Sequence, residues 1–120
     1  MTQKAPSPEN PSATVDDIVS ALNDMKALNI EIMDVEKLTD VTDRLVIATG
    51  TSRRHVKACA SNVRDELKAK GHAIIGTEGE EDADWVLVDL GSVVVHVMLR
   101  ETREFYDIES LWRDLPRGDQ

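Results

Sequence analysis

The sequence contains one cysteine, Cys59, and only four aromatic residues among its 120 amino acids. A single thiol forms no internal disulfide, and this cysteine usage fits a reducing compartment. With so few aromatic residues, aliphatic side chains must build the core. No apolar run approaches the roughly 20 residues that cross a bilayer, and the N-terminus lacks the order of a signal peptide. We therefore expect a cytoplasmic protein without a membrane partner.

Positive charge is also scarce. The chain has 14 Lys and Arg residues against 23 Asp and Glu residues, which gives a net charge of −9. Proteins bind nucleic acid largely by neutralising phosphates with Lys and Arg, so we expect little or no direct nucleic-acid binding. A basic protein partner fits this charge better, because opposite potentials speed encounter and favour correct orientation.

The N-terminal segment changes character near Thr14. Residues 1–13 contain three of the four prolines among polar residues, which predicts a disordered leader. A helix is predicted from Thr14, because residues 14–17 resemble a capping box with aspartate in place of glutamate. Asn29 is the expected C-terminal stop. Between them, apolar residues recur at helical spacing: Val15, Ile18, Val19, Leu22, Met25 and Leu28.

Strand and helix patterns alternate through the middle of the chain. Residues 30–35 alternate like a strand, residues 37–43 are polar and predict a loop, and the apolar run 45–49 predicts a central strand. Gly50-Thr51-Ser52 forms the turn out of that strand, and Ser52 can cap a second helix. The apolar stripe of this helix and the glycine at its expected end are Val56, Ala60, Val63, Leu67 and Gly71. A short strand at 73–76 and an acidic loop at 77–83 are predicted to follow.

A β-hairpin is predicted from residues 84–90, a Gly91-Ser92 turn and residues 93–99. Side chains alternate across a strand, so a turn with an even number of residues creates two distinct faces. One face is aliphatic and should pack on helices: Val86, Val88, Leu90, Val93, Val95, Val97 and Leu99. The other is mixed and suits a recognition surface or a second core layer: Trp85, Leu87, Asp89, Val94, His96 and Met98.

The C-terminal segment 100–115 has a helical composition and ends at Pro116, with a polar tail at 116–120. A stripe of Phe105, Ile108, Leu111 and Trp112 is predicted to pack on the body, leaving Tyr106 exposed. The order of elements predicts an α/β fold in which helices pack on a mixed β-sheet. We expect one domain, spanning residues 14–115.

Three groups of residues are candidates for chemistry. The acidic run 78–84 lacks EF-hand spacing and predicts a solvated or partner-facing loop rather than a metal site. The Gly50-Thr51-Ser52 turn lacks the P-loop pattern, and either phosphate binding or a plain capped turn is compatible with it. The three histidines lack zinc spacing, and Cys59 lies beside an apolar stripe, which favours a buried and inert thiol.

Several motifs, taken together, resemble the ribosomal silencing factor (Iojap) family. These motifs stand in the family's order and spacing over residues 14–115: Asp43–Ser52, His55-Val56, Gly76–Glu80, Asp84–Gly91, Val94–Met98, Arg103–Glu109 and Leu111-Trp112. The resemblance implies a fold related to nucleotidyltransferases without their catalytic residues, with no enzymatic activity and no cofactor or metal.

The resemblance also implies a mechanism. A family member is expected to bind the large ribosomal subunit through ribosomal protein L-fourteen, a basic protein, and to block joining of the small subunit when nutrients run short. Free members are expected to form homodimers. For this chain we predict that the contact residues are Glu78, Asp84, Trp85, Asp89, His96, Met98 and Tyr106. The alternative is a small nucleotidyltransferase-like or phosphate-binding enzyme that uses the Gly50-Thr51-Ser52 turn.

Overall fold

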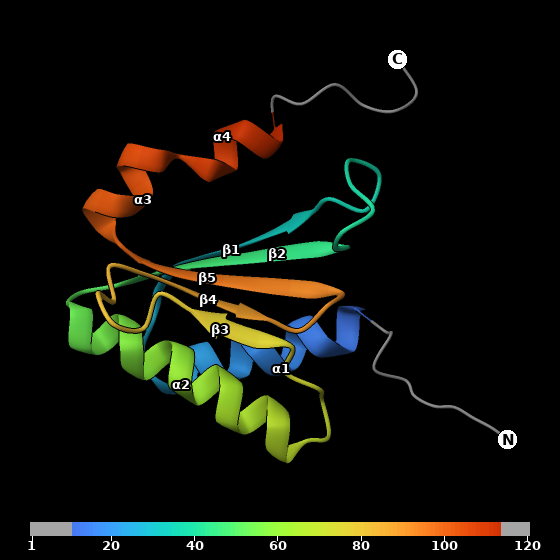
Figure 1. Ribbon diagram of the computed structural model, residues 1–120, viewed down its shortest axis with the longest axis horizontal. Coiled ribbons are helices and arrows are strands. Elements are labelled where there is room, and N and C mark those ends of the chain that lie inside the picture. The colour runs from blue at the N-terminus through green and yellow to red at the C-terminus, as the bar shows by residue number, and fades with distance from the viewer. Residues whose placement is uncertain (1–10, 114–120) are drawn as a thin grey trace, which may run out of the picture.

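Figure 1 shows the computed structural model, which describes residues 11–113 as a five-stranded sheet with helices on both faces. Helices α1 and α2 lie below the sheet in this view, and α3 and α4 lie above it. In chain order the elements are α1 (Pro11–Asp24), β1 (Leu28–Asp34), β2 (Arg44–Gly50), α2 (Arg53–Ala69), β3 (Gly76–Glu78), β4 (Trp85–Asp89), β5 (Val93–Leu99), α3 (Arg100–Tyr106) and α4 (Ile108–Arg113). This architecture confirms the predicted α/β fold with a mixed sheet.

The strands lie in the order β1-β2-β5-β4-β3, so the last strand of the sequence occupies the centre of the sheet. Strands β2 and β5 run parallel, and the other three neighbouring pairs run antiparallel. Strand β2 is an interior strand that is buried along nearly its whole length, as its continuous apolar sequence predicts.

The predicted hairpin register is confirmed. Val88 pairs with Val95 and Val86 with Val97, so the aliphatic side chains share one face. The turn has two residues, because the backbone N–H of Leu90 donates to the carbonyl of Val93 at 2.9 Å across Gly91-Ser92. An even turn and period-two alternation therefore fix which side chains meet the helices.

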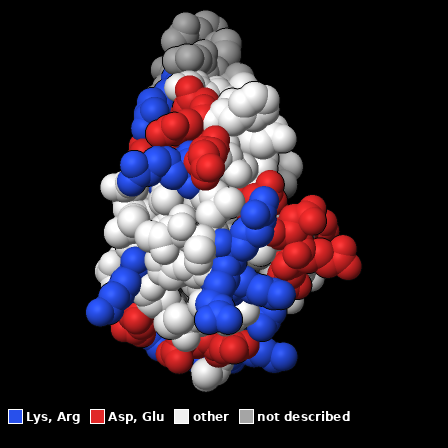
Figure 2. All heavy atoms as spheres, turned by 90° about the vertical axis from the view of Figure 1, so that its left-hand side faces the viewer, with Lys and Arg blue, Asp and Glu red and all other residues white. Residues whose placement is uncertain are grey.

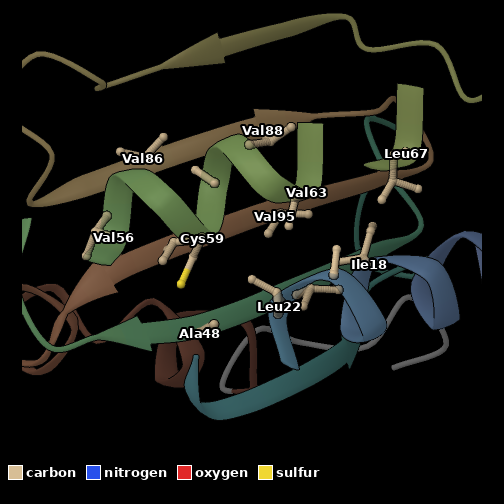
Figure 3. Packing of buried hydrophobic residues seen from close by; sticks show 14 of the residues in the cluster. Ile18, Leu22, Ala48, Val56, Cys59, Val63, Leu67, Val86, Val88 and Val95 are labelled. Atoms are coloured by element: carbon tan, nitrogen blue, oxygen red, sulfur yellow. The ribbon is translucent and has the colours of Figure 1, made fainter. Parts of the chain in front are cut away.

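The main hydrophobic core lies between this aliphatic face and helices α1 and α2. Figure 3 shows Ile18 and Leu22 of α1 and Val63 of α2 gathered with Val88 and Val95 of the sheet in one apolar cluster. Cys59 is completely buried in the same layer, and burial raises the pKa of its thiol to about 11. This confirms that Cys59 is a core residue, since a reactive cysteine needs a lowered pKa and access to solvent.

Helix α2 begins and ends as predicted. The Ser52 hydroxyl accepts a hydrogen bond from the backbone N–H of His55 at 3.1 Å, which caps the first turn. At the other end Gly71 has φ +93°, and the N–H of His72 donates to the carbonyl of Leu67 at 2.9 Å. This is a Schellman ending, in which glycine adopts the left-handed conformation with little strain.

The boundaries predicted for α1 are wrong at both ends. The helix begins at Pro11 rather than Thr14, so residues 11–13 of the predicted leader are helical and Thr14 is buried within the helix. Proline is tolerated in the first helical turn, where the missing N–H has no intrahelical partner. The helix ends at Asp24, because Lys26 adopts φ +60° and the N–H of Ala27 donates to the carbonyl of Leu22. Residues 1–10 of the leader and the tail at 116–120 lie outside the described residues.

Two further predictions need correction. The short strand predicted at 73–76 is found at Gly76–Glu78, and Ile75 is exposed. The C-terminal helix is broken into α3 and α4 at Asp107, whose φ of +47° is left-handed. The break changes which side chains face the sheet. Phe105 and Leu111 of the predicted packing stripe are exposed, while Ile108 and Trp112 are partly buried.

Candidate protein-binding surface

The second face of the sheet is only partly covered. Arg103 of α3 fixes the covering helices above β1 and β2, since its guanidinium donates to the Asn29 carbonyl at 2.7 Å and to the Thr49 hydroxyl at 2.8 Å. Arg103 also bonds the Glu109 carboxylate at 2.9 Å, and Arg113 of α4 pairs with Glu31 of β1. Helices α3 and α4 are therefore tied to the β1–β2 side of the sheet.

The part of this face formed by β4 and β5 is less covered. We call it the open face and define it by Trp85, Leu87, Asp89, Val94 and His96. The first four are partly exposed, and His96 is buried. Glu78 of the neighbouring strand β3 pairs with Leu87 and is exposed beside them. The open face thus combines apolar area with polar groups, as protein interfaces do.

Trp85 and His96 form a hydrogen-bonded pair in the open face. The indole N–H of Trp85 donates to Nδ1 of His96 at 3.0 Å. Burial lowers the pKa of His96 to about 4, so the ring is neutral near pH 7 and its proton resides on Nε2. Nε2 has no hydrogen-bond partner among residues 11–113, although the side chain is almost fully buried. This donor lies on the open face, where an acceptor of a bound partner could satisfy it.

An aromatic group extends the open face onto α3. The rings of Trp85 and Tyr106 lie 5.0 Å apart between centroids, and Tyr106 meets Phe105 edge-on at 4.9 Å. Phe105 is 80% exposed and Tyr106 is 56% exposed. Tyr106 is thus exposed as predicted, whereas Phe105 was expected in the core. Large exposed aromatic side chains grouped in this way are typical of protein-binding surfaces.

Among the seven predicted contact residues, Trp85 contacts the side chains of His96 and Tyr106 and pairs with Met98 in the strand register. Met98 is completely buried on the side of the sheet that faces α3, so its predicted role as a direct contact conflicts with its position. The Asp89 carboxylate accepts the Gly91 N–H at 2.8 Å and thereby supports the hairpin turn. Asp84 is partly buried just before β4, and Glu78 is exposed at the far edge.

The remaining candidate sites have structural explanations. In the Gly50-Thr51-Ser52 turn, the Thr51 N–H donates to Nδ1 of His55 at 2.9 Å, so its backbone donor already has a partner. Nε2 of the same ring lies 2.7 Å from the Met25 carbonyl at the end of α1, which fits the plain capped turn. Within residues 11–113 no three His, Cys, Asp or Glu side chains are grouped to hold a metal, and no helix there is long and apolar enough to cross a bilayer.

The acidic loop between β3 and β4 has a defined conformation. Gly79 has φ +87°, and a Cβ at this position would lie 2.1 Å from the Trp85 carbonyl oxygen. The turn is closed by a bond from the Ala83 N–H to the Gly79 carbonyl at 2.9 Å, and Glu80 pairs with Arg64 of α2 at 2.9 Å. Glycine at this position allows the loop to pack directly against the start of β4.

Comparisons with known proteins agree with one another. A family model described as ribosomal silencing factor during starvation matches residues 8–120. A Chromobacterium violaceum protein named ribosomal silencing factor RsfS is 51% identical over 94 residues, covering 78% of this chain and 77% of its own length. The mouse protein named mitochondrial assembly of ribosomal large subunit protein 1 is 39% identical over 101 residues, which cover 82% of this chain and 44% of that protein.

A solved structure supports the fold independently. The crystal structure of a Chromobacterium violaceum protein matches with a TM-score of 0.84 at 45% sequence identity, and the match covers 89% of both chains. A second crystal structure, of a Bacillus halodurans protein, gives a TM-score of 0.77 at 34% identity over 84% of this chain and 94% of that one.

Proposed function

Because the chain belongs to the ribosomal silencing factor family, we propose that it binds the large ribosomal subunit and thereby represses translation in the cytoplasm. The name of the mouse relative refers to the ribosomal large subunit, which supports that subunit as the partner. The protein component proposed for the contact is ribosomal protein L-fourteen, as the motif resemblance implies. The net charge of −9 suits a basic partner.

The open face and the aromatic group beside it are the proposed contact surface. The observation that supports this most directly is the unpartnered Nε2–H of His96, because an acceptor on the partner would satisfy it. Trp85 and Tyr106 offer rigid apolar area around this donor, and such residues often dominate binding energy. Glu78 and Asp84 are proposed to offer carboxylates to Lys or Arg of the partner.

The proposed mechanism is steric and involves no bond-making step. A factor seated on the large subunit at the face that meets the small subunit would prevent joining for as long as it stays bound. Repression then depends on affinity and on the concentration of the factor relative to subunits. We propose that the cell uses this effect under nutrient limitation or in stationary phase. We also propose that the free protein forms a homodimer and that its fold is related to that of nucleotidyltransferases.

Cosedimentation tests the proposal. The purified chain should migrate with isolated large subunits in a sucrose gradient, and small subunits added afterwards should form fewer complete ribosomes than without the factor. A chain that stays at the top of the gradient would contradict the proposal, and so would normal subunit joining in the presence of a saturating amount of bound factor.

A matched pair of variants tests the surface. Tyr106→Glu places a charge within the aromatic group and should reduce binding at least tenfold. Val41→Glu makes the same kind of change at an 83% exposed residue in the loop between β1 and β2, and should leave binding unchanged. Equal loss of binding in both variants would place the contact elsewhere or indicate a purely electrostatic effect.

A further inference from the structure

Helix α2 presents a row of cations to solvent. We call Arg53, Arg54, Lys57, Arg64 and Lys68 the basic stripe. Arg53 and Lys57 lie four residues apart, as do Arg64 and Lys68, so they fall on one side of the helix. The buried stripe of Val56, Ala60, Val63 and Leu67 occupies the adjacent side of the helix, which packs on the sheet. From Arg53 to Lys68 the helix rises about 22 Å. Although the chain has a net charge of −9, the first half of α2 carries Arg53, Arg54 and Lys57 without an acidic residue, and the acidic residues of the helix, Asp65 and Glu66, lie in its second half.

The placement of Arg53 and Arg54 does not favour the helix itself, whereas Lys68 lies in the last turn, where the helix dipole favours a cation. The first turn of α2 contains no acidic residue, and Arg53 and Arg54 lie at the end where the helix dipole is positive. Like charges four residues apart also repel one another. Arg64 is paired with Asp65 and Glu80, but the structure gives Arg53, Arg54, Lys57 and Lys68 no ion pair or hydrogen bond from a side chain of residues 11–113. A locally unfavourable placement of this kind is a feature expected at a functional site.

A cavity lies beside the N-terminal half of the basic stripe. Its volume is about 520 Å³, and one wall is formed by Arg53, Arg54, Lys57, Ala58 and Ser61 of α2. The other wall is formed by Glu81, Asp82 and Ala83 of the loop between β3 and β4. Figure 2, which looks at this end of the molecule, shows Lys and Arg side chains gathered together and bordered by a dense acidic group.

The basic stripe begins at the same end of the sheet as the proposed contact surface. Helix α2 follows the C-terminal end of β2. Trp85 of β4 pairs with Met98 of β5, which in turn pairs with Thr49 of β2, so Trp85 lies near the same end of the sheet. The two surfaces lie on opposite faces of the sheet (Figure 1). A partner large enough to extend around this end of the molecule would meet both.

We propose that the basic stripe contacts the phosphate backbone of ribosomal RNA next to the docking site, an inference that rests on the proposed binding to the large subunit. A polyanion presents charges repeatedly along its length and can engage several cations over 22 Å at once, and arginine is well suited to phosphate oxygens. This local contact differs from the expectation drawn from the net charge. Salt screens exposed charges beyond about 8–10 Å, so nearby side chains decide what a surface binds.

The acidic wall of the cavity makes the contact conditional. Glu81 and Asp82 repel phosphates that approach the free protein, so the stripe binds isolated RNA weakly. Once the open face is docked, the RNA contact becomes intramolecular, and a weak interaction then adds to the overall affinity through effective concentration. The stripe therefore favours ribosomal RNA only in the context of the assembled subunit.

The salt dependence of binding tests this inference. The double variant Arg53→Glu/Lys57→Glu should bind intact large subunits at least tenfold more weakly than the wild type. The slope of log K against log salt concentration should become shallower by about 1.5, because each lost phosphate contact releases about 0.7–0.9 fewer counterions. The variant should fold normally, because glutamate at the start of a helix is favourable. Its melting temperature checks this.

The matched control is Lys26→Glu/Lys37→Glu, which produces the same change in net charge outside the stripe. This control should keep the wild-type salt slope. Equal slopes for the two double variants would overturn the inference, while leaving the proposed function intact if the wild type still binds. Failure of the wild type to bind large subunits would instead overturn the proposed function.

Photo-crosslinking identifies the class of partner. A benzophenone amino acid is placed at position 57 of the full chain, in place of Lys57, and the chain is bound to intact large subunits. Irradiation should give adducts that ribonuclease shortens. Adducts that are sensitive only to protease would show that the stripe meets an acidic protein and would overturn the RNA contact, as would the absence of any adduct from a bound chain.

Discussion

The two faces of the β4–β5 hairpin have the same backbone and neighbouring residues but different surroundings. Val95 of β5 faces helices α1 and α2 and is completely buried. The adjacent Val94 points to the open face and is partly exposed. The aliphatic face contains only carbon side chains among its buried members. The open face contains a hydrogen-bonded Trp85–His96 pair and an aspartate.

This difference separates stability from recognition within one pair of strands. The aliphatic face contributes through burial of apolar area, which needs no particular partner beyond close packing. The open face has polar groups and aromatic rings that stay partly exposed to solvent, unlike the side chains of a protein interior. Substitutions on the first face should therefore change the free energy of unfolding, and those on the second should change binding.

The largest expected effect concerns the buried polar group on the open face. His96 has a folded-state pKa of about 4 against 6.5 for an ordinary histidine, so the unfolded chain binds its proton first as the pH falls. Stability is therefore fully retained above about pH 6.5 and decreases between there and about pH 4, by about 3 kcal/mol. Urea unfolding at both ends of this range measures the loss.

The variant His96→Gln serves as the control for this prediction, because its amide oxygen can still accept the Trp85 indole N–H. It should lose about 3 kcal/mol less than the wild type over the same pH range. The lowered pKa of Asp17, which His72 and Lys70 stabilise, adds an acid-sensitive contribution that both proteins share. Identical pH profiles for the two proteins would mean that His96 does not control this behaviour.

The next effect compares two adjacent valines directly. Val95→Ala removes buried methyl groups from the core and should lower the free energy of unfolding by about 2 kcal/mol. Val94→Ala should cost less than about 1 kcal/mol, because its side chain is already partly exposed. Denaturant titrations of both variants measure the difference. Equal costs would show that the open face is packed as tightly as the core.

Substitution of Trp85 should have a smaller effect on the free energy of unfolding, but it should also weaken binding. Trp85→Phe keeps much of the ring contact with Tyr106 but removes the donor to His96, and leaving Nδ1 unpaired should cost about 1 kcal/mol of stability. Binding to large subunits should weaken about fivefold, because the orientation of both rings loosens. Isothermal unfolding and cosedimentation measure the two effects. Unchanged binding would remove Trp85 from the contact surface.

The smallest effect should come from outside both faces. Arg64 and Glu80 form an ion pair of 2.9 Å with both side chains about one third exposed. Glu80→Gln should change the free energy of unfolding by about 0.5 kcal/mol or less, since solvent screens exposed pairs. Thermal denaturation at low and high salt measures this. A larger loss would show that the acidic loop contributes to folding as much as the open face does.

The sequence predicted features that depend on local rules. The faces of the hairpin followed from alternation and from the two-residue turn at Gly91-Ser92, and both ends of α2 followed from Ser52 and Gly71. The boundary of α1 did not follow, because Lys26 adopts a left-handed conformation that lysine rarely takes. The sequence had one signal for the earlier start, since Pro11 is a residue that favours the first helical turn.

The candidate site was only partly predictable. Strand alternation placed Trp85 and His96 on one face, as the structure does, whereas the contact of the exposed Tyr106 with Trp85 had no sequence signal. The burial of Met98 and the exposure of Phe105 depend on how α3 turns back over β5 and on the break at Asp107. Those are tertiary effects with no clear local signature, since aspartate is common within helix termini and loops alike.

The position of β5 affects how the protein is made. Because this strand lies between β2 and β4, the pairs β1–β2 and β3–β4 have no strand contact with each other until residues 93–99 are present. A nascent chain therefore completes its sheet only after residues 93–99 have been synthesised. Until then one edge of β2 is open to pairing with other chains.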